Sequence, residues 1–267
     1  MRHRHLSFPG LSAIATLLVL TLAACVKSPH VVQPPAVDPG FHEQKIGASA
    51  RDLLSEKRFH SLTVEIQYMQ GFRPEEETVT GLKDFLQQFL CKPGGIAVVL
   101  REVNATAKKK LSRNDALLIE NRYRTKFAAD DTIAVYFFIS NGSHPDRKVL
   151  GMAYRNTSAV IYGGAIKKNA GPGHVLAKAE LETAVILHEM GHLLNLGNAA
   201  SPSASNRSRK EKHQHCQNKM CLMYWATETQ DAAVIHRKGK IPQLDEHCRK
   251  LLLANGGSPE AAVQEKR

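Results

Sequence analysis

The sequence predicts an α/β protein built on a mixed, twisted β-sheet, and three observations lead to this prediction. Segments with strand-like and helix-like periodicity alternate along the chain, which is typical of a sheet covered by helices. Residues 132–140 form a continuous apolar run bounded by polar residues, as expected of a strand buried on both faces. The 267 residues, 43% of them hydrophobic, suffice for one core and leave little for a second. We therefore expect one folded domain over residues 45–255.

The first half of this domain is expected to alternate strands with helices. Residues 61–69 alternate apolar and polar side chains and predict a strand, and residues 96–103 predict a second. Between them, residues 75–90 place apolar side chains at helical spacing, and a Lys-Pro-Gly-Gly sequence ends that helix. Residues 112–127 predict another helix, with Ser112 as a possible N-terminal cap. Its buried face is expected to carry Leu117, Leu118 and Tyr123.

The second half is expected to contain two short strands and two helices. The strands fall at residues 149–154 and 159–166, separated by a polar Arg-Asn-Thr-Ser sequence. Apolar periodicity predicts a helix over residues 177–196 and a final helix over residues 242–253. Residues 256–267 form a polar tail.

The helix at residues 177–196 carries the sequence His188-Glu189-Met-Gly191-His192. Residues four apart lie on one helix face, so His188 and His192 can bind one ion together, and neutral imidazole suits Zn²⁺. Glu189 points elsewhere and can accept a proton from a water held at the metal. Gly191 has no side chain, so the helix is expected to be narrow at the point where a substrate approaches. This arrangement favours metal-assisted hydrolysis.

A second cluster follows, with the spacing His215-Cys216-x4-Cys221-x-Met223. Together the two clusters resemble the metzincin signature of zinc endopeptidases, and the second resembles its archaemetzincin branch. The resemblance implies a zincin fold with an active-site helix, a Met-turn at Met223 and a C-terminal helix. It implies zinc ligands His188, His192 and His215, with residues 198–214 as a polar insert that splits the motif. It also implies an antiparallel edge strand that pairs with an extended polypeptide substrate, here residues 149–154 or the neighbouring strand.

The third zinc ligand has alternatives besides His215. His213 is two residues away, Asn198 holds the spacing of the family's third histidine, and Glu211 lies where another class of zinc protease supplies a glutamate. Catalytic zinc usually has three protein ligands and a water, so one of these four completes the pair.

The remaining cysteines favour disulfides over a second metal. Archaemetzincins hold a second, structural zinc with additional cysteines that this chain lacks in part, which makes one catalytic Zn²⁺ the simpler expectation. An exported chain with four further cysteines is expected to form disulfides, with three alternative pairings. The favoured pairing joins Cys216 to Cys221 and leaves Cys91 with Cys248.

The N-terminus predicts export. Residues 1–24 combine Arg2 and Arg4 with an apolar stretch too short to span a membrane comfortably. The stretch ends in Leu-Ala-Ala-Cys25, which resembles the lipobox of bacterial lipoproteins and implies acylation of Cys25. Residues 25–44 are rich in proline and are expected to tether the domain to the membrane. The expected location is the bacterial envelope, at the outer membrane and facing the periplasm or cell surface.

These features together predict an envelope-anchored zinc metalloendopeptidase in which Glu189 is the general base. The alternative is a non-catalytic zinc-binding or structural lipoprotein that keeps the same fold. The net charge of +11 suits an anionic surface. No nucleic-acid motif accompanies this charge, so we expect a polypeptide substrate and a lipid membrane as partners, and no nucleic acid.

Overall fold

The structure is a computed structural model that describes residue 38 and residues 40–104, 108–172, 176–197, 215–229, 231 and 240–259. The chain separates into residues 1–33 and residues 34–267, and every described residue belongs to the second part. Several predicted features lie outside the described residues. They are the signal peptide, the expected acylation site Cys25, most of the tether, the 198–214 insert and most of the tail.

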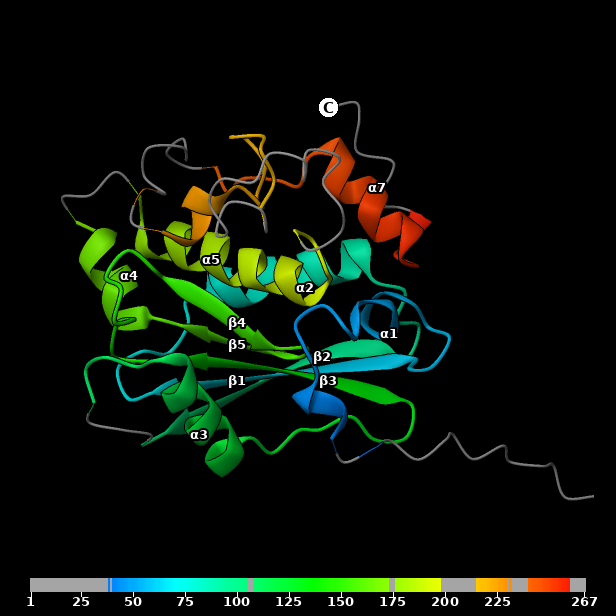
Figure 1. The fold of residues 1–267 in the computed structure, drawn as a ribbon, viewed down its shortest axis with the longest axis horizontal. Coiled ribbons are helices and arrows are strands. Elements are labelled where there is room, and N and C mark those ends of the chain that lie inside the picture. Colours follow the sequence, from blue (N-terminus) through cyan, green and yellow to red (C-terminus); the bar gives the residue numbers. More distant parts are fainter. Residues whose placement is uncertain are drawn as a thin grey trace, which may run out of the picture. The chain divides into compact units, whose positions relative to one another are not determined.

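The domain is mixed α/β, as predicted, with a five-stranded twisted sheet in the order β2-β1-β3-β5-β4 (Figure 1). All neighbouring pairs are parallel except β4 and β5, so β4 is an antiparallel edge strand. The strand bounds are β1 (Ser61–Met69), β2 (Gly95–Val103), β3 (Thr132–Ile139), β4 (Gly151–Arg155) and β5 (Ser158–Ile161).

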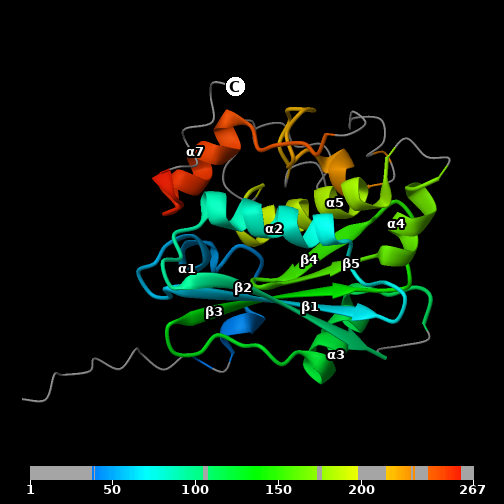
Figure 2. The ribbon, with the colours of Figure 1, turned by 180° about the vertical axis from the view of Figure 1, so that it is seen from behind.

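Helices cover both faces of this sheet. Helices α2 (Glu76–Phe89) and α5 (Lys178–Leu193) lie on one face, and α3 (Arg113–Tyr123) lies on the other (Figures 1 and 2). The shorter helical segments are η1 (Phe41–Glu43), α1 (Ala50–Leu54), α4 (Gly163–Asn169), η3 (Trp225–Glu228) and α7 (Glu246–Ala254). None of the helices in the described residues combines the length and apolar character needed to cross a membrane.

Strand β3 lies in the middle of the sheet and is buried on both faces, as its apolar run predicted. Strand β1 departs from its predicted alternation, because Glu65 and Gln67 are also buried. The chain after α3 covers their face of the sheet, where Glu65 accepts hydrogen bonds from the backbone N–H groups of Thr125 and Lys126. These bonds offset the cost of burying a carboxylate.

Two further sequence predictions were wrong in part. The expected strand over residues 159–166 ends at Ile161 and turns into α4, because Gly163 and Gly164 let the backbone approach the end of β3 closely. Helix α3 has its predicted Ser112 cap, which accepts from Asp115 N, but Leu118 is 68% exposed. The face of α3 turned to the core instead carries Ala116, Ile119 and Glu120.

Candidate metal centre

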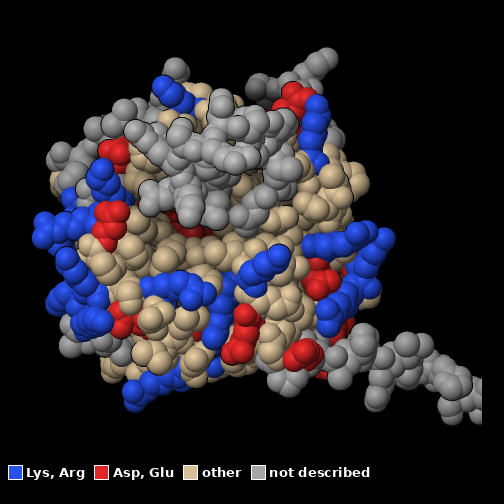
Figure 3. Space-filling model, viewed as in Figure 1, with Lys and Arg blue, Asp and Glu red and all other residues tan. Residues whose placement is uncertain are grey.

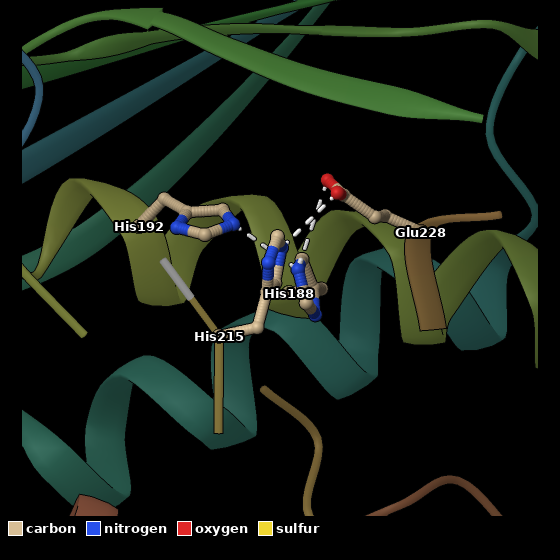
Figure 4. Close-up of side chains that lie close together, drawn as sticks. All are labelled: His188, His192, His215 and Glu228. Atoms are coloured by element: carbon tan, nitrogen blue, oxygen red, sulfur yellow. Dashed lines mark hydrogen bonds and ion pairs between the residues drawn. The ribbon is translucent and has the colours of Figure 1, made fainter. Parts of the chain in front are cut away.

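Helix α5 places two histidines side by side at the bottom of a cleft. His188 and His192 are one turn apart, and their Nε2 atoms lie 3.1 Å from each other (Figure 4). The Nδ1 atom of His188 donates a hydrogen bond of 2.7 Å to the Leu222 carbonyl, which turns Nε2 toward His192. Burial, and then the proximity of His188, lower the pKa of His192 to about 3. His192 is therefore neutral, the form that ligates metals.

His215 joins this pair from a distant part of the chain. Its ring centroid lies 5.2 Å from that of His188 and 5.1 Å from that of His192. Tetrahedral zinc with bonds of roughly 2.0–2.1 Å places its ligand atoms about 3.3 Å apart. One ligand atom each from the three histidines and from Glu228 lies within 4.8 Å of the others, so this donor set fits a zinc ion.

Glu228 is the fourth member of this group and comes from η3. One of its carboxylate oxygens lies 3.1 Å from His215 Nε2, and the other lies 3.7 Å from His188 Nε2 (Figure 4). Burial opposes its charge, but the hydrogen bond with His215 and the neighbouring histidines lower the pKa of Glu228 to about 2. The side chain is 20% exposed and ionised at neutral pH.

Glu189 lies on the sheet side of the histidines, against the edge strand β4. The backbone N–H of Ala153 donates a 2.6 Å hydrogen bond to Glu189 Oε2, while Oε1 is buried without a hydrogen-bond partner. A Cβ atom on Gly151 would come within 2.5 Å of Glu189 Oε1, so glycine is needed for this close approach. Burial, and then the Glu228 charge, raise the pKa of Glu189 well above its ordinary range.

Met223 is fully buried beside Gly191 of α5, and the resemblance assigned the Met-turn to this residue. A Cβ atom on Gly191 would lie 2.3 Å from Met223 Sδ. The expectation that Gly191 leaves room for a substrate was therefore wrong, because the space beside it is taken by Met223. The next turn is sharp as well, since Asn195 ends the helix with a φ of 65°, a conformation that asparagine tolerates better than most residues.

The cleft above these residues has a volume of about 730 Å³. The edge strand β4 forms one wall with residues 151–153, and residues 45–48 form another. In the face shown in Figure 3, an uncharged band crosses the middle of the molecule, with lysine and arginine side chains gathered along its borders. Within the described residues, the lining of the cleft is mostly uncharged, with Lys45, Glu189 and Glu228 as its Lys, Asp or Glu residues.

Three cysteines and an aspartate form a second group of metal-binding type. One ligand atom from each of Cys216, Cys221, Asp245 and Cys248 lies within 4.8 Å of the others. Cys221 Sγ lies 3.7 Å from Cys248 Sγ, and Cys216 Sγ lies 3.1 Å from a carboxylate oxygen of Asp245. Hydrogen bonds from the thiols of Cys221 and then Cys248 lower the pKa of Cys216 to about 2.

The described cysteines form no disulfide, so the structure contains neither Cys216–Cys221 nor Cys91–Cys248. The physical reason is that α7 brings Cys248 to Cys221, which puts three sulfur atoms around one point where two were expected to bond. Sequence reasoning missed Asp245 in this group. Asp245 lies three residues before Cys248. The two residues therefore have the spacing of the common zinc-ligand pair Cys-x2-Cys, with aspartate in place of the first cysteine.

The structure thus brings together His188, His192 and His215 from the sequence prediction, with Glu189 on the same helix as the first two and Met223 beside Gly191. The alternatives His213, Glu211 and Asn198 lie outside the described residues. Sequence reasoning missed Glu228, since a lone glutamate five residues after Met223 follows no ligand spacing.

The protein is a mixed α/β protein with two side-chain groups that could each hold a metal ion. No family model and no curated protein matches the sequence. Among solved structures, the crystal structure of archaemetzincin from Methanopyrus kandleri is similar, with a TM-score of 0.51 and 16% identity. The match covers 74% of this chain and 97% of that chain, which shows that this chain has an archaemetzincin-like fold.

Proposed function

We propose that this protein is a zinc metalloendopeptidase of archaemetzincin type. The observation that supports it best is the position of Glu189, a buried carboxylate beside three clustered histidines at the floor of an open cleft. His188, His192 and His215 are the proposed zinc ligands, and the Leu222 carbonyl orients His188. Bound there, Zn²⁺ would polarise the scissile carbonyl and acidify a water molecule.

Glu189 is the proposed general base. The Ala153 N–H holds one of its oxygens, and the other has no hydrogen-bond partner and can accept a proton from the attacking water. Once protonated, this carboxyl can donate the proton to the departing amine. The same side chain thus acts first as base and then as acid.

The edge strand β4 is the proposed binding site for the polypeptide. An extended peptide can add to an exposed strand edge through backbone hydrogen bonds, and β4 borders the cleft next to Glu189. The uncharged band of Figure 3 suits a polypeptide backbone with neutral side chains.

The test compares Glu189→Gln with wild-type protein. Glutamine keeps the shape of the side chain and cannot accept the proton, so zinc content should stay at the wild-type level while hydrolysis is lost. Hydrolysis is measured by mass spectrometry of new termini in a denatured protein pool, and zinc by elemental analysis. Full activity of Glu189→Gln would contradict this mechanism. His215→Ala should lose zinc, and unchanged zinc binding would move the third ligand to His213, Glu211 or Asn198.

A non-catalytic zinc-binding lipoprotein is the second candidate, and the position of Glu228 favours it. Three histidines and a carboxylate form a closed set of four ligands, which is typical of structural zinc sites. Under this alternative the wild-type protein binds zinc and produces no new termini.

We also propose a second, structural zinc held by Cys216, Cys221, Cys248 and Asp245, in place of the expected disulfides. Three sulfur ligands and one carboxylate complete a tetrahedral set. Wild-type protein should then contain two zinc ions, and Cys216→Ser one. Four cysteines that resist thiol-reactive reagents until a reducing agent is added would instead indicate disulfides.

The proposed location is the bacterial envelope, through acylation of Cys25, with the outer membrane as the expected site. Metabolic labelling with a fatty acid should mark the wild-type protein and spare Cys25→Ser. A membrane fraction that still contains the unlabelled variant would point to another mode of attachment.

A further inference from the structure

We propose that Glu228 is a fourth metal ligand that closes the resting site, so that a substrate must displace it before hydrolysis. This inference rests on the proposed function, because it assumes that His188, His192 and His215 hold the metal. It goes beyond that function by assigning a role to Glu228, which the general mechanism does not require.

The distances around Glu228 are those of a ligand. Its carboxylate oxygens lie 3.1 Å from His215 Nε2 and 3.7 Å from His188 Nε2, and the two α5 histidines are 3.1 Å apart. These spacings bracket the separation of about 3.3 Å between ligand atoms of a tetrahedral zinc ion. In Figure 4 the Glu228 carboxylate points to the nitrogen atoms of His188 and His215.

The backbone around Glu228 holds the side chain in this place. Its carbonyl accepts a 2.8 Å hydrogen bond from Leu150 N, and Thr229 forms an antiparallel bridge with Val149. Residues 149 and 150 directly precede the edge strand β4, so η3 lies across the end of the edge where a substrate is expected to bind. A polypeptide that extends along β4 toward residue 149 therefore meets this segment and can release Glu228 from the metal.

The experiment uses the cobalt-substituted protein and acetohydroxamate, a small chelating ligand that needs the position taken by Glu228. Binding is followed by the visible spectrum of Co²⁺, a readout independent of activity. Glu228→Gln keeps the size of the side chain and removes the charge. Glu228→Asp keeps the charge and shortens the reach, which separates ligation from simple repulsion of the hydroxamate. Asp231→Asn is the control, since Asp231 is exposed on the same segment.

We expect both Glu228 variants to bind acetohydroxamate at least about tenfold more tightly than wild type. If Glu228 occupies the metal position about 90% of the time, it weakens a competing ligand by about tenfold. Asp231→Asn should bind it as wild type does. Equal hydroxamate affinity in wild type and both Glu228 variants would overturn the inference and leave the proposed function intact. A wild-type protein that binds neither Co²⁺ nor Zn²⁺ would overturn both. Tighter binding in Glu228→Gln alone would reduce Glu228 to an electrostatic role and overturn ligation.

Discussion

Gly191→Ala is expected to destabilise the protein, although alanine normally stabilises a helix. A Cβ atom at this position lies 2.3 Å from Met223 Sδ, more than 1 Å inside ordinary contact, and Met223 is fully buried. Overpacking of this kind costs about 1–3 kcal/mol. Alanine recovers about 1 kcal/mol relative to glycine in a helix interior. The expected net loss is about 0–2 kcal/mol. Zinc binding should weaken as well, because Gly191 lies next to His192 in the sequence and the clash shifts this part of α5.

The energy of the contact between the new Cβ atom and Met223 can be measured with a double-mutant cycle that combines Gly191→Ala with Met223→Val, which removes the sulfur atom. In that background Gly191→Ala should become stabilising by up to about 1 kcal/mol, giving a coupling of about 1–3 kcal/mol. The assay is urea unfolding at one fixed zinc concentration, since bound metal adds to apparent stability. A Gly191→Ala protein more stable than wild type, or an equal effect in both backgrounds, would refute the steric explanation.

Three further outcomes are expected. Lys92→Met should lower the free energy of unfolding by about 2–4 kcal/mol. The buried Lys92 ammonium donates hydrogen bonds to three backbone carbonyls, which would lose their donor. Urea unfolding midpoints measure this loss. Glu120→Ala should cost about 3–5 kcal/mol, since it removes the carboxylate that pairs with the buried Arg124 and Arg155 guanidinium groups and leaves Arg155 only its longer contact with Glu43. A thermal midpoint unchanged from wild type would contradict this. Gly151→Ala should reduce hydrolysis by about 10–100-fold with zinc content unchanged, because its Cβ displaces the general base; steady-state kinetics and elemental analysis check it.

The fold was predictable from the sequence wherever periodicity and burial agree. The bounds of β1 matched residue for residue, and the fully apolar β3 lies in the middle of the sheet as predicted. Prediction was wrong where tertiary contacts override local pattern. Leu118 points to solvent because Glu120, a charged residue, is drawn inward by two arginines.

The candidate site was predictable to the extent that its residues share a local spacing. His188, Glu189 and His192 lie on one helix, and His215 was found through the cysteines and methionine that follow it. Glu228 escaped because its proximity to the histidines arises only when residues 149 and 150 bind its backbone. The cysteine pairing was wrong for the same reason, since α7 brings Cys248 across the fold.

The backbone N–H of Ala153 is one donor for which two acceptors can compete. Without a peptide in the cleft, Glu189 Oε2 accepts its hydrogen bond. A carbonyl of a peptide laid along β4 can take that same proton, because Ala153 belongs to the edge strand. A peptide bound along β4 and the Glu189 carboxylate would then share one donor. A small molecule that does not contact β4 would leave the bond to Glu189 intact.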